Sequence, residues 1–393
     1  MLSFYLLVFF LFENSLAQSL NNTQLDGSRQ NSLQTAVPFL RITPHSRAGG
    51  MGNAGVAVEG DANASAINVA SLAFLPVNTG GVAVSYSPWL KELASDMSLS
   101  YLSGYYRLDE RNTITGSFRY FSIGDIRMTD NDFNNIGVYN PNELAVDVGY
   151  ARSLGPSLSL GGSFRFIYSN LFSGQTSSGV QARADKAFAA DVSALYRKEG
   201  AFLGTSALWS AGVNISNIGT KIAYSAASRT YFLPTNLCIG TAATLKGSDN
   251  NRLTIALDFN KLLVPTQPIY DQEGNIIRGK DPDRSVPAGI FGSFTDAPGG
   301  FSEEMKEVGI SSGLEFCFNN LIAFRAGYHY RNPDKGDQSY LTLGTGVQYA
   351  SYSFDFAYIP GSARTNPLAG TLRFGLQARF GRGGIDRAAA RPQ

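Results

Sequence analysis

Residues 251–260, with the sequence NRLTIALDFN, decide the fold of this chain. Large apolar side chains alternate in this stretch with small or polar ones, which is the pattern of a β-strand with one apolar face. The apolar face would carry Leu253, Ile255, Leu257 and Phe259, and the opposite face would carry Thr254, Ala256, Asp258 and Asn260. The length suits a tilted membrane-spanning strand of about 9–11 residues, whereas strands of soluble proteins average about 5–6.

The same alternation recurs from residue 80 to residue 380. We predict fourteen strands, at residues 80–87, 97–107, 112–122, 143–151, 157–168, 187–197, 206–216, 235–246, 251–260, 306–318, 321–331, 339–349, 351–359 and 370–380. Long and short connections alternate between them. Because outer-membrane barrels have short periplasmic turns and longer extracellular loops, the pattern also predicts the orientation. The predicted fold class is all-β: a closed 14-stranded antiparallel transmembrane β-barrel in the outer membrane, with long loops at the cell surface and both termini periplasmic.

The charged residues of these strands lie opposite the large apolar side chains. They are Arg119, Asp147, Arg165, Asp191, Asp258, Glu315, Arg325, Asp355, Arg373 and Arg379. A charge facing lipid at the midplane would cost roughly 2–4 kcal/mol, so the apolar face is expected to meet lipid. Only 16% of the residues are charged, below the roughly 25% of soluble domains. A soluble β-sandwich, the alternative fold, would carry more Lys and Glu on its water-exposed face.

Differences in composition divide the chain into five segments. Residues 1–17 are predicted to be a signal peptide, because a short apolar run precedes small residues at a cleavage site, although no Lys or Arg precedes the run. Residues 18–35 are polar and are expected to be a flexible N-terminal segment. Residues 36–79 are rich in Gly and Ala and are predicted to be a lumen plug, because side chains alone fill only narrower barrels. Residues 80–380 would form the barrel, and residues 381–393 a periplasmic tail.

One motif inside the predicted plug suggests a dinucleotide site. Residues 50–55, with the sequence GMGNAG, match the pattern G-x-G-x-x-G. A nucleotide site needs a strand directly before the motif and a helix that opens on it, and residues 41–46 (RITPHS) lack the pattern of a buried strand. The glycines are instead expected to allow tight turns and close backbone contacts in a crowded lumen.

Several stretches resemble PorV-type outer-membrane proteins of the type IX secretion system. They are PFLRI at residues 38–42, RAGGMGNAGVA at residues 47–57, NVASLA at residues 68–73 and NKLLVPT at residues 260–266. The first two contain the plug motif, whose residues are Phe39, Arg41, Arg47, Gly50, Met51 and Gly52. The PorV group is similar in fold to the FadL barrels, which have fourteen strands and an N-terminal plug.

The resemblance implies a non-catalytic role in protein secretion. The implied partners are secreted cargo proteins with a C-terminal signal domain, a translocon barrel and a surface sortase complex, with outer-membrane lipid around the barrel. Extracellular loops would receive the cargo, which would then pass to the sortase complex. The alternative is a FadL-like transporter of hydrophobic small molecules, which would need an apolar pocket that leads to an opening in the wall or the plug.

The sequence carries no recognisable catalytic, cofactor or metal site. A barrel lipase needs a nucleophile and a histidine on the face that meets lipid, whereas His45 belongs to the predicted plug and His329 to the lumen side of a strand. No His or Cys cluster with metal-ligand spacing occurs. The formal net charge of +1 excludes a nucleic-acid partner, because nucleic-acid-binding proteins carry a basic excess.

The longest predicted loop, residues 261–305, is too apolar for a loop that meets only water. The residues predicted to bind a partner are Leu262, Leu263, Val264, Pro265, Ile269 and Tyr270. The alternative is that its apolar residues fold back over the barrel mouth. The loops at 123–142, 169–186 and 217–234 are the other candidate interfaces.

The two cysteines are predicted to be free thiols, although exported proteins commonly form disulfides. Cys238 lies early in one strand and Cys317 lies late in the next strand but one, and both are on the lumen side. These positions predict a separation of roughly 20 Å or more, whereas a disulfide needs Cα atoms within about 7 Å.

Overall fold

The computed structural model describes residues 31–91, 96–129, 134–171, 174–175, 181–182, 184–202, 204–224, 230–248, 250–336, 338–362 and 366–381. The predicted signal peptide, residues 18–30 and the predicted tail after Gly381 lie outside these residues. In the part of the chain that is described, no helix is long and apolar enough to cross a membrane.

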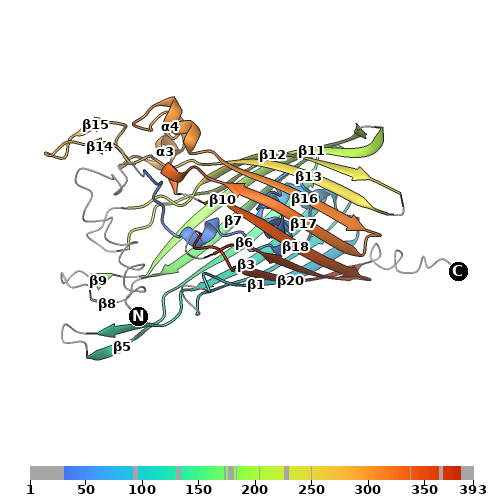
Figure 1. Cartoon of the computed structure of the whole chain (residues 1–393), viewed down its shortest axis with the longest axis horizontal. Helices are drawn as coiled ribbons and strands as arrows, with labels where there is room; N and C mark the ends of the chain where they lie inside the picture. The colour runs from blue at the N-terminus through green and yellow to red at the C-terminus, as the bar shows by residue number, and fades with distance from the viewer. Residues whose placement is uncertain are drawn as a thin grey trace.

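Fourteen antiparallel strands form one closed barrel, which confirms the predicted all-β, closed 14-stranded antiparallel architecture. Each strand pairs with the strands before and after it in the wall, and β1 pairs with β20 to close the barrel (Figure 1). The strands are β1 (Thr79–Pro88), β2 (Ser98–Arg107), β3 (Asn112–Ser122), β6 (Asn142–Ser153), β7 (Leu158–Asn170), β10 (Asp185–Phe202), β11 (Thr205–Gly219), β12 (Asn236–Lys246), β13 (Arg252–Leu262), β16 (Gly309–Phe318), β17 (Ile322–Tyr330), β18 (Tyr340–Tyr349), β19 (Tyr352–Tyr358) and β20 (Leu372–Gly381).

The two ends of the barrel differ in the length of their connections. At the turn end the connections are short, such as residues 203–204 and 350–351. At the loop end they are long, and the longest spans residues 263–308. The long connections contain β4 (Ile126–Thr129), β5 (Asn135–Tyr139), β8 (Gly174–Gln175), β9 (Gln181–Ala182), β14 (Ile269–Tyr270), β15 (Ile276–Arg278), α3 (Val286–Gly292), α4 (Phe301–Lys306) and η5 (Pro333–Lys335). Figure 1 shows these elements beyond one end of the barrel, as the alternation of connection lengths predicts.

Two predicted boundaries differ clearly from the structure. The connection expected at residues 198–205 is instead the tip of the β10–β11 hairpin, in which Lys198 pairs with Trp209. Its side chains are largely exposed on both faces of β10, so the sequence has no alternation there. The strand expected at residues 306–318 begins at Gly309, because helix α4 and the turn after it occupy the residues before it.

Side chains alternate between an exposed outer face and a buried inner face of the wall. On β13, Ile255, Leu257 and Phe259 are exposed, whereas Thr254, Ala256 and Asp258 are buried. The predicted inward charges are buried at Arg119, Asp147, Arg165, Asp191, Asp258, Glu315, Arg325, Asp355 and Arg373. Arg379, near the turn end of β20, is exposed.

Several buried charges of the inner face pair with one another. Arg165 contacts Asp147 at 2.5 Å and Asp191 at 3.0 Å. Arg325 contacts Glu315 at 2.7 Å and Asp355 at 2.8 Å. Because removing one partner of a buried pair costs about 3–5 kcal/mol, these sets limit which substitutions the inner face tolerates.

Residues 31–78 run from the loop end to the turn end, against the inner faces of strands from both halves of the barrel. The backbone N–H of Asn31 donates to the carbonyl of Asp334 in a long connection, at 2.9 Å. The elements that follow are η2 (Pro38–Arg41), α2 (Ser46–Gly50), η3 (Ala64–Ala66) and η4 (Val69–Phe74). Helix α2 contacts β17 to β20, and η4 contacts β2, β3, β6, β7 and β10.

The described residues nearest the two termini lie at opposite ends of the barrel. The sequence predicts that both termini lie at the turn end, and the last described residue, Gly381, does lie there. Asn31, the first described residue, lies at the loop end, but the N-terminus itself lies outside the described residues, so its periplasmic position stays a prediction. The strand pattern could not predict this, because a segment without alternation carries no information about its direction.

Gly52 occupies a position that excludes a larger residue. Its φ is +65°, and an added Cβ would lie 2.6 Å from the backbone nitrogen of Tyr328 and 2.7 Å from the carbonyl oxygen of Ser312. Its backbone N–H donates to Thr342 Oγ1 at 2.8 Å. A Cβ on Gly50 would likewise lie 3.0 Å from the Cα of Gly344. The close backbone contacts expected of the glycine motif are therefore confirmed.

Cys238 and Cys317 are buried free thiols, as predicted. Both pair with the intervening strand β13, Cys238 opposite Asn260 and Cys317 opposite Arg252. Because these two partners lie near opposite ends of one strand, the sulfur atoms are too far apart for a disulfide.

We expect Gly52→Ala to lower the free energy of unfolding by about 2–5 kcal/mol. A left-handed φ costs an alanine about 1–2 kcal/mol, and the contacts with Tyr328 and Ser312 add an overpacking cost of about 1–3 kcal/mol. Gly204→Ala is the matched control, because Gly204 has a φ of +81° and an added Cβ there would meet no atom within 4 Å. Thermal unfolding of both variants in detergent measures the difference. Equal losses would contradict the packing described for Gly52.

Candidate functional site

We call residues 263–308 and 331–339 the loop-end cap. The first connection contains the β14–β15 hairpin and the helices α3 and α4. Pro287 stands in the first turn of α3, where its missing N–H has no helical partner to lose. Helix α4 has Glu303 and Glu304 in its first turn and Lys306 in its last, which suits the helix dipole.

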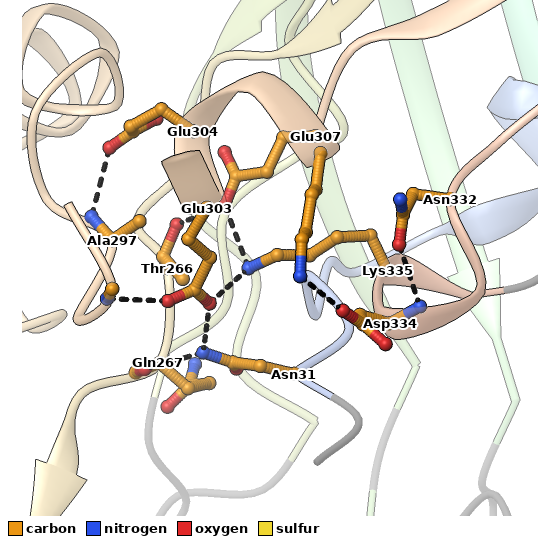
Figure 2. A network of polar contacts seen from close by, with 12 residues as sticks. Asn31, Thr266, Gln267, Ala297, Glu303, Glu304, Glu307, Asn332, Asp334 and Lys335 are labelled. Carbon is orange, nitrogen blue, oxygen red and sulfur yellow. Dashed lines mark hydrogen bonds and ion pairs between the residues drawn. The ribbon is translucent and has the colours of Figure 1, made fainter. Parts of the chain in front are cut away.

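Glu307 is the centre of a buried polar network in the cap (Figure 2). Its carboxylate accepts hydrogen bonds from Lys261 Nζ at 2.6 Å, Lys335 Nζ at 3.0 Å and Thr266 Oγ1 at 2.7 Å. The side chains of Glu307 and Lys335 are 0% and 1% exposed. The network therefore joins the end of β13 to both parts of the cap.

Two further glutamates extend the network. Glu304 contacts Lys261 Nζ at 2.9 Å and accepts the backbone N–H groups of Asp296 and Ala297. Glu303 accepts from Lys335 Nζ at 2.6 Å and from Asn31 Nδ2 at 3.1 Å. Asn31 belongs to the segment expected to be flexible, yet this end of the segment is bonded to the cap.

Lys335 also affects the ionisation of Glu303. Partial burial opposes the charged carboxylate, but the hydrogen bond and charge of Lys335 outweigh it and lower the pKa of Glu303. A lowered pKa in the folded state means that this contribution to stability is present at neutral pH and is lost as the pH falls through the lowered value.

The cap buries four of the residues predicted to bind a partner. Leu262, Leu263 and Val264 are 4%, 2% and 0% exposed, and Pro265 is also buried. Leu262 and Val264 form a core cluster with Phe232, against which Leu33 and Val286 pack. These four residues offer no contact surface in this structure, so their assignment as contact residues is corrected. The stretch folds back over the barrel mouth because its apolar side chains find a core there.

Other residues of the cap are exposed and apolar. Ile269 and Tyr270 are half-buried in β14. The large exposed apolar side chains are Ile276, Ile277, Phe291, Phe294, Phe301 and Met305. Among them Phe291 and Phe301 are 78% and 80% exposed. The apolar composition of the loop predicted such a surface, but not which of its residues form it.

Helix α4 has the reverse of the usual amphipathic arrangement. Phe301 and Met305, four residues apart, share one face and are 80% and 54% exposed. Glu304 and Glu307, on another side, are 6% and 4% exposed. A surface helix normally buries its apolar stripe and exposes its charges, so this helix presents an apolar face without a partner in the described chain.

The plug-motif residues contact the wall at several positions. The ring of Phe39 stacks on Phe121 with centroids 6.3 Å apart. Arg47 contacts Glu315 at 2.7 Å and Asp61 at 3.5 Å, and Met51 is buried against Gly313. Gly50 and Gly52 approach the strands as described above. Arg41 instead lines a cavity at the loop end.

Each histidine lies close to one polar side chain. His45 Nε2 is 3.2 Å from Asp61 Oδ2. His329 Nδ1 is 2.9 Å from Ser311 Oγ, but both side chains are buried on the inner face, where the His329 ring packs on Tyr340. Among the described residues, no group of three or more His, Cys, Asp or Glu could hold a metal ion.

Two cavities lie along residues 31–78. One of about 20 Å³ is formed within the segment, among His45, Arg47, Met51 and Asp61. The other, of about 180 Å³, lies between the segment and the cap. Its lining is mainly polar: Ser32, Leu33, Arg41, Leu262, Glu307, Arg331, Lys335, Gly336 and Gln338.

Several solved barrels are similar to this chain. The Pseudomonas putida toluene transporter TodX is 13% identical, with a TM-score of 0.47 over 84% of this chain and 95% of that one. The Ralstonia pickettii toluene transporter TbuX is 12% identical, with a TM-score of 0.45 over 86% and 96%. A Pseudomonas aeruginosa FadL homologue is 10% identical, with a TM-score of 0.42 over 90% and 99%. No match was found among curated proteins.

The sequence itself matches a known family over more than half of its length. The family described as "Type IX secretion system protein PorV" covers residues 25–269. This range contains residues 38–42, 47–57, 68–73 and 260–266, the stretches that carry the resemblance. Proteins of this family are outer-membrane β-barrels of the type IX secretion machinery. The chain therefore belongs to the PorV family of type IX secretion system proteins.

Proposed function

We propose that this protein receives secreted cargo at the loop-end cap and passes it to a surface sortase complex, without catalysing a reaction. The cargo would carry a C-terminal signal domain, and a translocon barrel would be a further partner. The observation that carries the proposal is the outward apolar face of the cap, above all Phe291 on α3 and Phe301 on α4.

The proposed orientation of the barrel in the outer membrane rests on the lengths of the connections between its strands. Outer-membrane barrels place their short turns in the periplasm and their long loops outside. In this orientation the cap lies at the cell surface, where a protein that has crossed the membrane would arrive, and Gly381 lies on the periplasmic side.

The buried network makes the cap a suitable binding surface. The residues that contribute most to the free energy of binding at an interface are often aromatic side chains held on a preorganised support. Glu304 and Glu307 fix one side of α4 to Lys261 and the barrel, which holds Phe301 in place without ordering a flexible loop. Binding would therefore cost less conformational entropy than folding a loop onto the cargo.

We also propose that residues 36–78 act as a plug that closes the lumen to large solutes. Their contacts with strands from both halves of the barrel support this, as does the exclusion of a side chain at Gly52. A transporter of hydrophobic molecules, the alternative function, would need an apolar pocket, whereas the cavity of about 180 Å³ has a mainly polar lining.

Replacing both Phe291 and Phe301 with Ser should weaken cargo binding about tenfold or more, because truncated aromatic anchors typically cost more than 1 kcal/mol each. The measurement is capture of a cargo protein with its C-terminal signal domain by purified variants in detergent. The matched control is Tyr349→Ser with Tyr352→Ser, two exposed aromatic residues at the turn end. Both variants should keep the wild-type melting temperature. Unchanged capture by the Phe variant would move the interface to the loops at 123–141, 171–184 or 220–235.

The intact protein should show no steady porin-sized conductance in planar bilayers. A variant that lacks residues 36–78 should conduct, because a barrel of fourteen strands is wider than its own side chains can fill. Steady conductance from the intact chain would contradict the plug. Tight, saturable binding of a long-chain fatty acid, without capture of cargo, would favour the transporter.

A further inference from the structure

The cavity between residues 31–41 and the cap has an unusual charge balance. Its lining includes three basic side chains, Arg41, Arg331 and Lys335, but only one acidic side chain, Glu307. Ser32 and Leu33 form part of its wall from the N-terminal side. A polar cavity of about 180 Å³ has room for several water molecules or for one small polar group.

The single acid of the lining is already fully used. Both oxygens of Glu307 accept hydrogen bonds, from Lys261, Lys335 and Thr266. Lys335 is in turn neutralised by Glu303 and Glu307, at 2.6 Å and 3.0 Å (Figure 2). Neither Glu307 nor Lys335 forms an ion pair with either of the two arginines.

Of the two arginines, Arg331 has the more fully described surroundings. Its Nε is buried and has no hydrogen-bond partner, and no ion pair joins it to a carboxylate anywhere in the described chain. Burial lowers the pKa of its guanidinium, and no carboxylate counteracts this. Arg41 likewise forms no ion pair with the described residues. Arg331 and Arg41 are half-buried, so each guanidinium loses part of its hydration without gaining an anion, which a bound ligand would supply.

We propose that this cavity is a binding site for an oxyanion, either a carboxylate or a phosphate group, with Arg331 as its main anchor and Arg41 as the second. A guanidinium offers a planar fork of N–H donors that matches the two oxygens of such a group. The small volume and mainly polar lining fit the anionic group rather than an apolar chain. The inference does not depend on the proposed role in cargo transfer.

The test is thermal unfolding of the full chain in nonionic detergent, at constant ionic strength in chloride. Inorganic phosphate and acetate are titrated in separate arms, and a third arm adds phosphatidic acid to the micelles. A ligand that binds the folded state raises the melting temperature in a saturable way. Saturation by phosphate or acetate would identify a free anion, and saturation by phosphatidic acid alone would identify a lipid headgroup.

Arg331→Gln should abolish the saturable rise and should unfold at or above the wild-type temperature without ligand, because it removes a half-buried charge that has no ion pair. Arg278→Gln, at an exposed residue of β15, is the matched control and should respond like the wild type. Ser32→Phe tests the cavity from its other wall, leaves both arginines in place and should also remove the response. No saturable response of the wild type in any arm, or a full response of Arg331→Gln, would overturn the proposal.

Discussion

The pairing of β1 with β20 is the interaction on which the rest of the structure depends. Lipid offers no hydrogen-bond partner, so every backbone group of a spanning strand must bond to a neighbouring strand. The pairs from Thr79–Gly381 to Tyr86–Phe374 provide this for the last two edges of the sheet. Closure then separates two environments: the outer face carries the large apolar side chains, and the inner face collects the buried charges. Several inner charges find partners, either on the wall, as Arg165 does, or on residues 31–78, as Glu315 does with Arg47.

Much of this could be predicted from sequence because it follows from local alternation. Strand number, strand faces and connection lengths all depend on residues within one segment or its neighbour. The same reasoning failed at residues 198–205, where a hairpin extends beyond the wall and its side chains no longer alternate. It also missed the direction of residues 31–78, because that segment bonds to the cap through Asn31, and the partners Gln267 and Glu303 are more than 230 positions away.

The sequence indicated which loop forms the candidate site, but not which of its residues are exposed. Its apolar content indicated a surface or a core, and the structure contains both: Leu262 and Val264 form a core with Phe232, whereas Phe291 and Phe301 are exposed. Composition could not separate these groups, because the outcome depends on Lys261 and Lys335. These lysines come from different parts of the chain and hold Glu304 and Glu307 inward. The spacing of Glu303, Glu304 and Glu307 is the one local signal, since it places carboxylates on adjacent turns of a helix.

The inward glutamates also explain why the apolar face of α4 can point outward. A short helix has too little surface to bury an apolar stripe and a charged stripe against the same support. Burying the carboxylates is costly unless each is paired, and here Lys261, Lys335 and Thr266 supply the partners of Glu307. Once those pairs form, rotating α4 to bury Phe301 against the barrel would leave the two lysines buried without a counter-charge. The network thus stabilises the orientation in which Phe301 and Met305 remain available to a partner, and it does so before any partner binds.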